Sequence, residues 1–294
     1  MSSFVLYTVT GLGLAGLYFL LASGLSLIFG LMSVLNLAHG AFFAAGGYAA
    51  WWVMDSFDTV PAEPRFLLAV VAAGAVGAVA GALVERGLIR RLYGSHVRQI
   101  LLTIGLGMAA VALMGGWFTY NPRLMDQPAW FGATTQLVGA NIPNSRLLIL
   151  AVAIVMLVAL MAFLRGTRHG LIIRAGVENP SMARALGVDV ARSFTIVFAL
   201  GGLLAGIGGA LGAVYFNGIS PSLGTTQLIF AFIVVVIGGL GSVPGTAVAA
   251  VLVALTQIYV NNYVATGLGS IAVVVLLAVV LLVRPQGLLG KVQP

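Results

Sequence analysis

Residues 4–54 contain no charged side chain. A transmembrane helix needs about 20 consecutive apolar residues, so this run has room for two helices. In the whole chain of 294 residues, 61% are hydrophobic and 7% are charged, whereas a soluble domain carries roughly 25% charged residues. A soluble domain also covers its surface with polar groups, which this chain lacks. The sequence therefore predicts an all-α, polytopic bundle of transmembrane helices.

Charged and polar segments divide the chain into separate apolar spans. We expect a helix over about 4–29 and another over about 40–54, and then seven more at about 66–84, 100–118, 147–164, 194–214, 226–239, 245–262 and 268–283. If the interruption at 30–40 is a turn, there are nine crossings; if residues 30–54 form a re-entrant element, there are eight. Residues 1–294 are predicted to form a single transmembrane domain of eight to nine membrane-embedded helices.

The basic residues predict how the spans are oriented. Segments 85–98, 165–192 and 284–294 hold 11 of the 14 Lys and Arg residues, and an excess of these residues marks the cytoplasmic side of a membrane protein. We therefore expect a multi-pass protein of the bacterial cytoplasmic (inner) membrane with a cytoplasmic C-terminus. The same rule accounts for the net charge of +7, so the charge does not indicate nucleic acid as a partner.

Missing residues exclude several kinds of chemistry. The chain has no cysteine, which excludes disulfides and thiolate metal sites. It has no G-x-x-x-x-G-K-[ST] motif and Lys291 is its only lysine, so it cannot bind ATP in the Walker manner. We expect the chain not to be an enzyme, to have no catalytic residues, and to bind no metal or cofactor itself.

Two interruptions of apolar runs predict broken helices, near 30–40 and 238–245, that line a translocation path. Unwound backbone in a membrane is tolerated only against protein or a water-filled path. The candidate path residues are Asn36, His39, Gly40, Gly238, Gly239, Gly241, Ser242 and Pro244. The alternative interpretation is that both interruptions are tight turns between helices.

His39 is a polar group inside the long uncharged stretch. A lone histidine in a helix bundle can titrate or bind a metal. No Asp, Glu or second His lies within ten residues of it. A structural hydrogen bond that holds the interruption is therefore the favoured interpretation of this side chain.

A third candidate lies in the basic segment 165–192. Asn179 is a typical N-cap residue, Pro180 suits the first helical position, and Gly187 suits the left-handed position after the last turn. The pattern predicts a short amphipathic helix on the cytoplasmic side. Such a helix can dock into a groove of a partner protein or lie on the lipid surface, and the residues alone leave both possibilities open.

Four segments resemble, in the same order, the LivH-type permeases of branched-chain amino-acid ABC importers. They are GLSLIFGLMSVLNLAHG at 24–40, the loop from Arg174 through Glu178-Asn179 to Ala185-Leu186-Gly187, VIGGLGSVPG at 236–245, and RPQGLLG at 284–290. The resemblance spans most of the chain, and the four segments together are specific for the family. Segment 119–146 resembles nothing in particular.

The resemblance implies the permease subunit of an ABC importer for branched-chain or other small amino acids. Its implied partners are a second, LivM-like permease, two P-loop ATPase subunits that hold ATP and Mg, and an extracytoplasmic substrate-binding protein. The loop within 165–192 would insert into a groove of an ATPase and couple the subunits through Gly170, Arg174, Glu178, Asn179, Pro180, Ala183, Ala185, Leu186 and Gly187.

Other functions stay open at this point. Members of the same family carry urea, short amides and other small solutes, so an importer of this type for such a solute is one alternative. A self-sufficient channel or secondary carrier is another, and a membrane scaffold without transport is a third. Neither of the last two requires a capped cytoplasmic helix, so the segment at 170–187 favours the importer.

Overall fold

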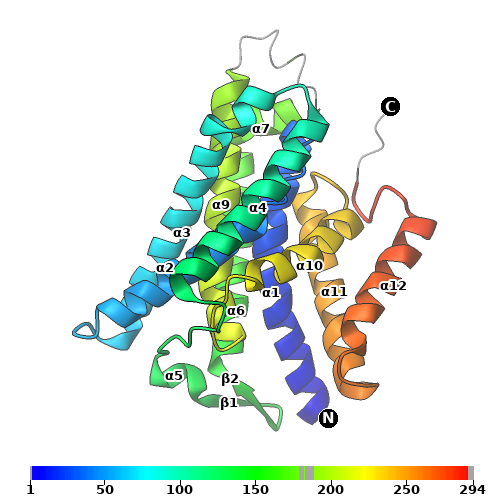
Figure 1. Ribbon diagram of the computed structural model, residues 1–294. Coiled ribbons are helices and arrows are strands. Elements are labelled where there is room, and N and C mark those ends of the chain that lie inside the picture. The colour runs from blue at the N-terminus through cyan, green and yellow to red at the C-terminus, as the bar shows by residue number, and fades with distance from the viewer. Residues whose placement is uncertain (1, 179–181, 183–188, 291–294) are drawn as a thin grey trace.

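The computed structural model describes residues 2–178, 182 and 189–290, and nearly all of its regular structure is helical (Figure 1). The helices are α1 (Ser2–Met32), α2 (His39–Ser56), α3 (Ala62–Gly87), η1 (Ile89–Leu92), α4 (His96–Phe118), α5 (Ala129–Gly132), α6 (Asn144–Gly166), α7 (Arg168–Glu178), α9 (Val190–Tyr215), α10 (Leu223–Gly238), α11 (Val243–Tyr263) and α12 (Leu268–Val283). Strands β1 (Thr134–Leu137) and β2 (Ala140–Pro143) form one antiparallel hairpin in the segment between α4 and α6. The prediction of an all-α polytopic bundle is confirmed.

Six of the described helices are long and apolar enough to cross a membrane: α1, α3 together with η1, α4, α6, α9 and α11. Helices α10 and α12 are apolar but have only 16 residues each. The predicted span at 66–84 is longer in the structure, because α3 continues to Gly87. As a result Glu85, which the sequence placed in a basic loop, lies in the last turn of this helix.

The basic segments gather at one end of the bundle, which we call the basic end. It carries the C-terminal end of α3, η1, α7 and residues 284–290 (Figure 1). Helix α1 begins at the opposite end and reaches the basic end, where its residue Gly30 packs against Gly241. The N-terminus and the C-terminal segment therefore lie at opposite ends. An odd number of crossings requires this, so the arrangement agrees with the nine-crossing alternative.

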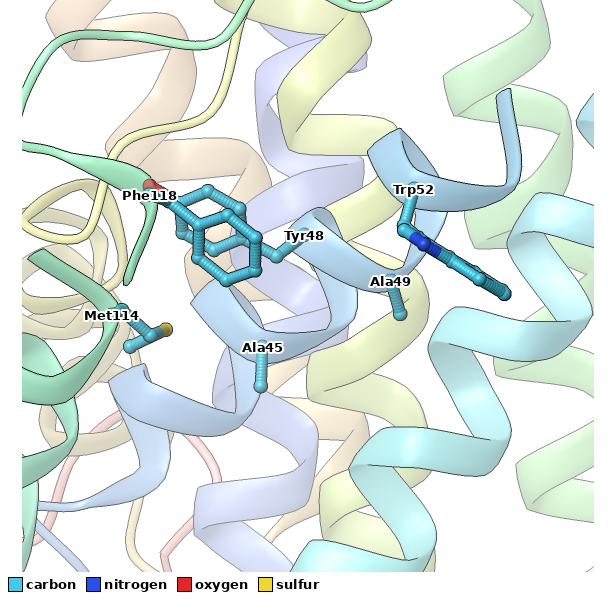
Figure 2. Close-up of a pocket in the computed structure, with 6 residues that line it drawn as sticks. All are labelled: Ala45, Tyr48, Ala49, Trp52, Met114 and Phe118. Atoms are coloured by element: carbon cyan, nitrogen blue, oxygen red, sulfur yellow. The ribbon is translucent and has the colours of Figure 1, made fainter. Parts of the chain in front are cut away.

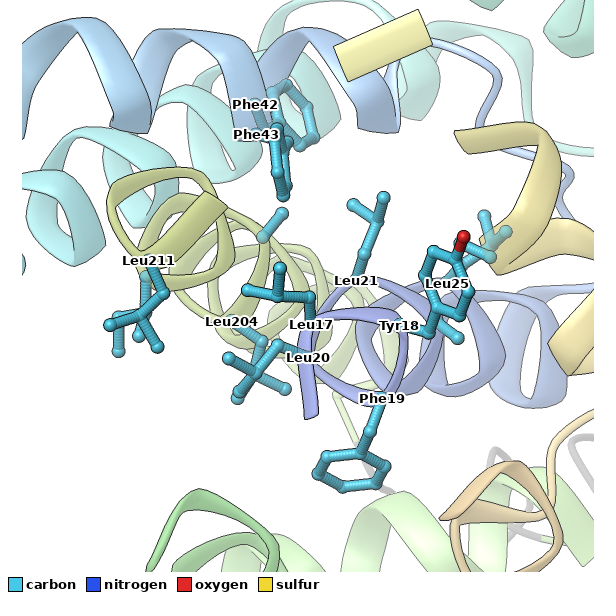
Figure 3. Packing of buried hydrophobic residues seen from close by; sticks show 14 of the residues in the cluster. Leu17, Tyr18, Phe19, Leu20, Leu21, Leu25, Phe42, Phe43, Leu204 and Leu211 are labelled. Atoms are coloured by element: carbon cyan, nitrogen blue, oxygen red, sulfur yellow. The ribbon is translucent and has the colours of Figure 1, made fainter. Parts of the chain in front are cut away.

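Helices α1 and α9 form the centre of the bundle and run in opposite directions. The most apolar window of α1 is 89% buried, against 11% in α4. Large side chains of α1 and α9 interlock with Phe42 and Phe43 of α2 around this centre (Figure 3). The antiparallel arrangement is fixed at the end of α9, where the Tyr215 hydroxyl donates to the Thr10 carbonyl near the start of α1.

The bundle contains two three-helix units of opposite direction, α1–α3 and α9–α11. Their contacts are reciprocal: α1 packs on α10 and α11, while α9 packs on α2 and α3. In addition, α1 contacts α9, and α2 contacts α10. This is the packing of an inverted repeat, in which substrate sites lie at the interface of the two halves.

Glycines allow the close approach of the two units. A Cβ atom on Gly77 of α3 would lie 2.0 Å from the carbonyl oxygen of Gly202 of α9, and one on Gly202 would lie 2.0 Å from the oxygen of Gly77. Small residues at helix interfaces are expected where association depends on packing in lipid.

Candidate functional site

The first break separates α1 from α2 and comprises residues 33–38. Ser33 leaves the helix with a φ of 52°. The chain then enters α2 through a turn in which the His39 backbone N–H donates to the Asn36 carbonyl at 3.1 Å. No side chain caps the N-terminus of α2. The predicted interruption near 30–40 is therefore a true break in helical structure.

The first break reaches the middle of the bundle. A Cβ atom on Gly24 of α1 would lie 2.9 Å from His39 Nε2 and 2.7 Å from the carbonyl oxygen of Gly201. Gly201 lies near the middle of α9, which runs from Val190 to Tyr215. Helix α2 therefore begins at mid-depth, and an extended segment rather than a helix connects it to the basic end.

Asn36 and His39 are fully buried at this depth without hydrogen-bond partners for their side chains. The Leu21 backbone lies close to the His39 ring, but neither ring nitrogen forms a hydrogen bond. The Leu21 backbone is thus the candidate partner for the structural hydrogen bond predicted for His39, and the backbone bond from His39 to the Asn36 carbonyl holds the turn. The described part of the chain contains no group of three His, Cys, Asp or Glu residues that could hold a metal ion. An unsatisfied buried polar group costs about 1–3 kcal/mol and calls for an explanation, such as a bound water, a partner or a role in function.

The second break separates α9 from α10 and comprises residues 216–222. It repeats the local geometry of the first: Asn217 leaves the helix with a φ of 55°, and the Leu223 N–H donates to the Ser220 carbonyl at 3.1 Å. Ser222, like Ala38 before α2, is an N-cap residue in the right-handed helical region without a capping side-chain bond. This register makes Gly224 of α10 the counterpart of Gly40 of α2.

These two counterparts touch, at a contact that we call the junction. A Cβ atom on Gly224 would lie 2.0 Å from the Gly40 carbonyl oxygen, and one on Gly40 would lie 2.5 Å from the Gly224 oxygen. The N-terminal ends of two short helices, one from each unit, therefore meet in the middle of the bundle.

The second break was not identified as a candidate from the sequence. Its residues Asn217-Gly218 and Ser220-Pro221-Ser222 are strong turn formers, and they lie between two predicted spans. They were the signal that could have revealed it.

The interruption at 238–245 has a different structure. Helix α10 ends at Gly238 and α11 begins at Val243, so the interruption forms a tight turn between two helices, and its place on a path stays a prediction. Gly239 and Gly241 have φ values of 97° and 81°. Ser242 Oγ accepts a bond from the Gly245 N–H at 3.1 Å, and Pro244 occupies the first turn of α11. The turn is therefore locally well bonded.

This turn lies at the basic end, away from the junction. The Leu288 and Leu289 N–H groups of the C-terminal segment donate to the Ile237 and Gly238 carbonyls at 2.7 and 3.1 Å. Candidate path residues Gly238, Gly239, Gly241, Ser242 and Pro244 thus lie together, but apart from Asn36, His39 and Gly40. The contact between Gly30 and Gly241 joins the end of α1 to the turn.

A polar cluster also lies at the basic end, around the fully buried carboxylate of Glu85. Arg90 donates to it from Nε and Nη2 at 3.2 and 3.3 Å, Thr195 Oγ1 donates at 2.5 Å, and the Tyr93 hydroxyl donates as well. Burial and the carboxylate raise the pKa of the Tyr93 phenol well above its ordinary value, so this hydroxyl remains a donor. The cluster ties α3 and η1 to the start of α9, where the predicted coupling loop ends.

The predicted ATPase-coupling residues are only partly covered by the structure. Gly170 lies in the first turn of α7, where its N–H donates to Thr167 Oγ1 at 2.9 Å and its Cα packs against Phe163 and Leu164. Arg174 is exposed on the same helix, and Glu178 is its last residue. The remaining residues, Asn179, Pro180, Ala183, Ala185, Leu186 and Gly187, lie outside the described residues.

An apolar cavity of about 260 Å³ lies between α2 and the end of α4 (Figure 2). Its walls are Ala45, Tyr48, Ala49, Trp52, Met114 and Phe118. Tyr48 stacks on Phe118 with ring centroids 4.3 Å apart. Such a lining suits an apolar chain better than a polar solute, so we do not assign the cavity to the transport path.

Comparison with known proteins finds similarity along nearly the whole chain. The family model described as "Branched-chain amino acid transport system / permease component" matches residues 7–284. The high-affinity branched-chain amino acid transport system permease protein LivH of Salmonella typhimurium is 28% identical over 291 residues, which cover 96% of this chain and 94% of LivH. The corresponding protein BraD of Pseudomonas aeruginosa is 28% identical over 294 residues, with the same coverage of 96% and 94%.

A second permease from the first of these organisms is also similar. The permease protein LivM of Salmonella typhimurium is 27% identical over 303 residues, which cover 95% of this chain and 69% of LivM. One organism therefore has two homologous permeases of a high-affinity branched-chain amino acid transport system, and this chain is similar to both.

Proposed function

The chain belongs to the family of branched-chain amino acid transport permease components, and from this we propose that it imports branched-chain or other small amino acids as one subunit of an ABC transporter. It would act as a single transmembrane domain of the bacterial cytoplasmic membrane. The basic end and the C-terminus would face the cytoplasm, in keeping with the positive-inside rule.

The junction is the observation that carries the proposal. Two helices begin there at mid-depth, and Asn36 and His39 are buried beside it without partners. None of the residues of the two breaks or of the first turns of α2 and α10 is charged. A site with polar but uncharged groups fits a solute without net charge, such as a zwitterionic amino acid, better than an ion.

The chain needs partners for this function. The similarity to both LivH and LivM favours a second, LivM-like permease across the path. Two P-loop ATPases would hold ATP and Mg, because this chain has no Walker motif. An extracytoplasmic binding protein would deliver the substrate. The segment from Gly170 to Gly187 would dock on an ATPase and move the permeases as rigid bodies.

Reconstitution tests this proposal. The chain is purified from detergent-solubilised native membranes, its co-purifying subunits are identified by mass spectrometry, and the complex is placed in liposomes with binding protein and labelled leucine. We expect a second permease and P-loop ATPases in the preparation, and uptake that requires ATP. Uptake by this chain alone without ATP would instead establish a channel or carrier.

Two further measurements refine the assignment. Competition by urea or acetamide, but not by leucine or alanine, would replace amino acids by small amides as the substrate class.

Replacing Glu178 and Leu186 together by alanine should abolish ATP-dependent uptake while ATP hydrolysis by the complex continues, since both lie in the proposed coupling segment. Normal uptake by that variant would show that this segment does not couple ATP hydrolysis to uptake.

A further inference from the structure

The two breaks are covered differently. Helix α4 lies over the first break: Thr103 Oγ1 donates to the Leu35 carbonyl at 3.2 Å, and a Cβ atom on Gly107 would lie 3.3 Å from the Leu37 oxygen. By chain order the counterpart of α4 is α12, which follows α11 as α4 follows α3. Helix α12 packs on α11 and α10 but leaves Ser222, Thr225 and Thr226 exposed.

The exposed hydroxyls lie on the surface of the bundle, at about half of its height. Thr225 and Thr226 follow directly after Gly224, the residue that meets Gly40 at the junction. Away from the ends of the bundle, the exposed side chains of helices α3, α4 and α6 are apolar, for example Val79, Met108 and Val155. Polar groups at this depth are expected to face a water-filled cavity or a partner rather than lipid.

The hydroxyls of this surface have unused hydrogen-bonding capacity. Thr226 Oγ1 donates to the Ser222 carbonyl at 3.2 Å, and the Ser220 and Ser222 hydroxyls lie 3.4 Å apart. Each hydroxyl can still accept bonds. In the first turn of α10 the Leu223 and Thr226 N–H groups already donate to the Ser220 and Ser222 carbonyls. Arg123, whose backbone pairs with Ile219, is directed toward Trp51 and the Phe118 carbonyl.

We propose that Ser222, Thr225 and Thr226 form the wall of the path that contacts the transported solute on the side opposite the basic end. The solute class is a small zwitterionic amino acid, whose carboxylate accepts from hydroxyl groups of this surface and whose ammonium donates to hydroxyl oxygens. This inference rests on the proposed import function and assigns the solute contact to the second break, whereas the first break is closed by α4.

Cysteine accessibility tests the wall directly, because the chain has no cysteine of its own. The variant Thr225→Cys is made in the native host, so that the partner subunits are present, and membrane vesicles are treated with a charged, membrane-impermeant thiosulfonate. The modified fraction of this chain is then measured by mass spectrometry. The matched control is Val155→Cys on α6, an apolar position with 62% exposure.

We expect Thr225→Cys to react at least about tenfold faster than Val155→Cys, because the reactive thiolate forms in water and not in lipid. Leucine should slow the reaction of the Thr225→Cys variant only. If Thr225→Cys reacts with a lipid-soluble maleimide but not with the charged reagent, or with neither, the surface faces lipid or is covered by a partner helix, and the proposal is wrong.

Uptake measurements separate solute contact from mere exposure. Thr225→Val should lower leucine uptake by raising the concentration needed for half-maximal rate, and Thr225→Ser should restore it, because serine keeps the hydroxyl. Equal uptake by the two variants would overturn the solute contact. If the unmodified complex shows no ATP-dependent uptake at all while the Thr225→Cys variant is still labelled, the importer function fails but the water-facing wall stands.

Discussion

The two breaks of the bundle have the same local geometry and opposite environments. Each leaves a long central helix through a residue of positive φ, Ser33 or Asn217, and each enters a short helix whose N-terminus no side chain caps. At the first, Asn36 and His39 are buried without partners and α4 covers Leu35, whereas at the second Ser222 and the following Thr225 and Thr226 are exposed. The shared backbone geometry comes from the repeated three-helix unit. The difference in cover comes from the helix that follows each unit, α4 or α12.

Under the proposed function, this difference in cover would separate the two sides of the translocation path. In an inverted repeat, the two halves approach the midplane from opposite faces of the membrane. A state in which one break is covered and the other is open has access from one side only. Under the proposed function, this arrangement would correspond to a path closed at the basic end and open toward the opposite end.

The largest effect is expected at the junction itself. In Gly224→Ala the added methyl group would lie 2.0 Å from the Gly40 carbonyl oxygen, so two backbones must move apart. Overpacking of this kind costs about 1–3 kcal/mol or more. We expect a clear loss of thermal stability in detergent, and a similar loss in Gly40→Ala, because the two glycines are counterparts.

Gly105→Ala is the matched control for this experiment. Nothing lies within 4 Å of a Cβ atom at Gly105 on α4. Alanine there should be neutral or stabilise the helix by up to about 1 kcal/mol. If Gly224→Ala were as stable as Gly105→Ala, the two breaks would not meet as described.

The sequence predicted the helices and the first break, but not the equivalence of the breaks. Charge-free runs and turn formers are local signals, so they identified the spans and the polar groups at 36–40. Residues 216–222 carry similar local signals, but their depth depends on the contact of Gly224 with Gly40, which are far apart in the sequence. The same limit applies to Glu85, whose buried carboxylate accepts from Thr195, a residue far away in the sequence, as well as from Arg90 and Tyr93.

The next effect concerns the unpartnered groups of the first break. Asn36→Leu keeps the size of the side chain and removes two unsatisfied polar atoms. We expect unfolding in detergent to require about 1–3 kcal/mol more free energy, while leucine uptake falls. Thr225→Val should lower uptake without that gain, because Thr225 is already exposed. A loss of stability in Asn36→Leu would mean that Asn36 has a structural partner in the complex.

A smaller effect distinguishes the first break from the turn at 238–245. Ser242→Ala removes the bond that caps α11 and should cost about 1 kcal/mol of stability. If this segment acts as a turn, uptake per folded molecule stays near that of the unmodified chain. The measurement is leucine uptake divided by the amount of monodisperse complex. A strong decrease in this ratio would indicate that the turn lies on the translocation path.

The smallest effect is expected when the cover of the first break is loosened. Thr103→Val keeps the shape of the side chain but removes its bond to the Leu35 carbonyl, while Thr103→Ser keeps the hydroxyl. Because the single hydroxyl hydrogen is shared with the Ile100 carbonyl of the same helix, the bond to Leu35 is weak, and we expect a loss of only about 1 kcal/mol. A cysteine introduced at Leu37 should then react with the charged thiosulfonate about fivefold faster in the valine background than in the serine background. An unchanged rate would show that packing of α4, rather than this hydrogen bond, keeps the first break closed.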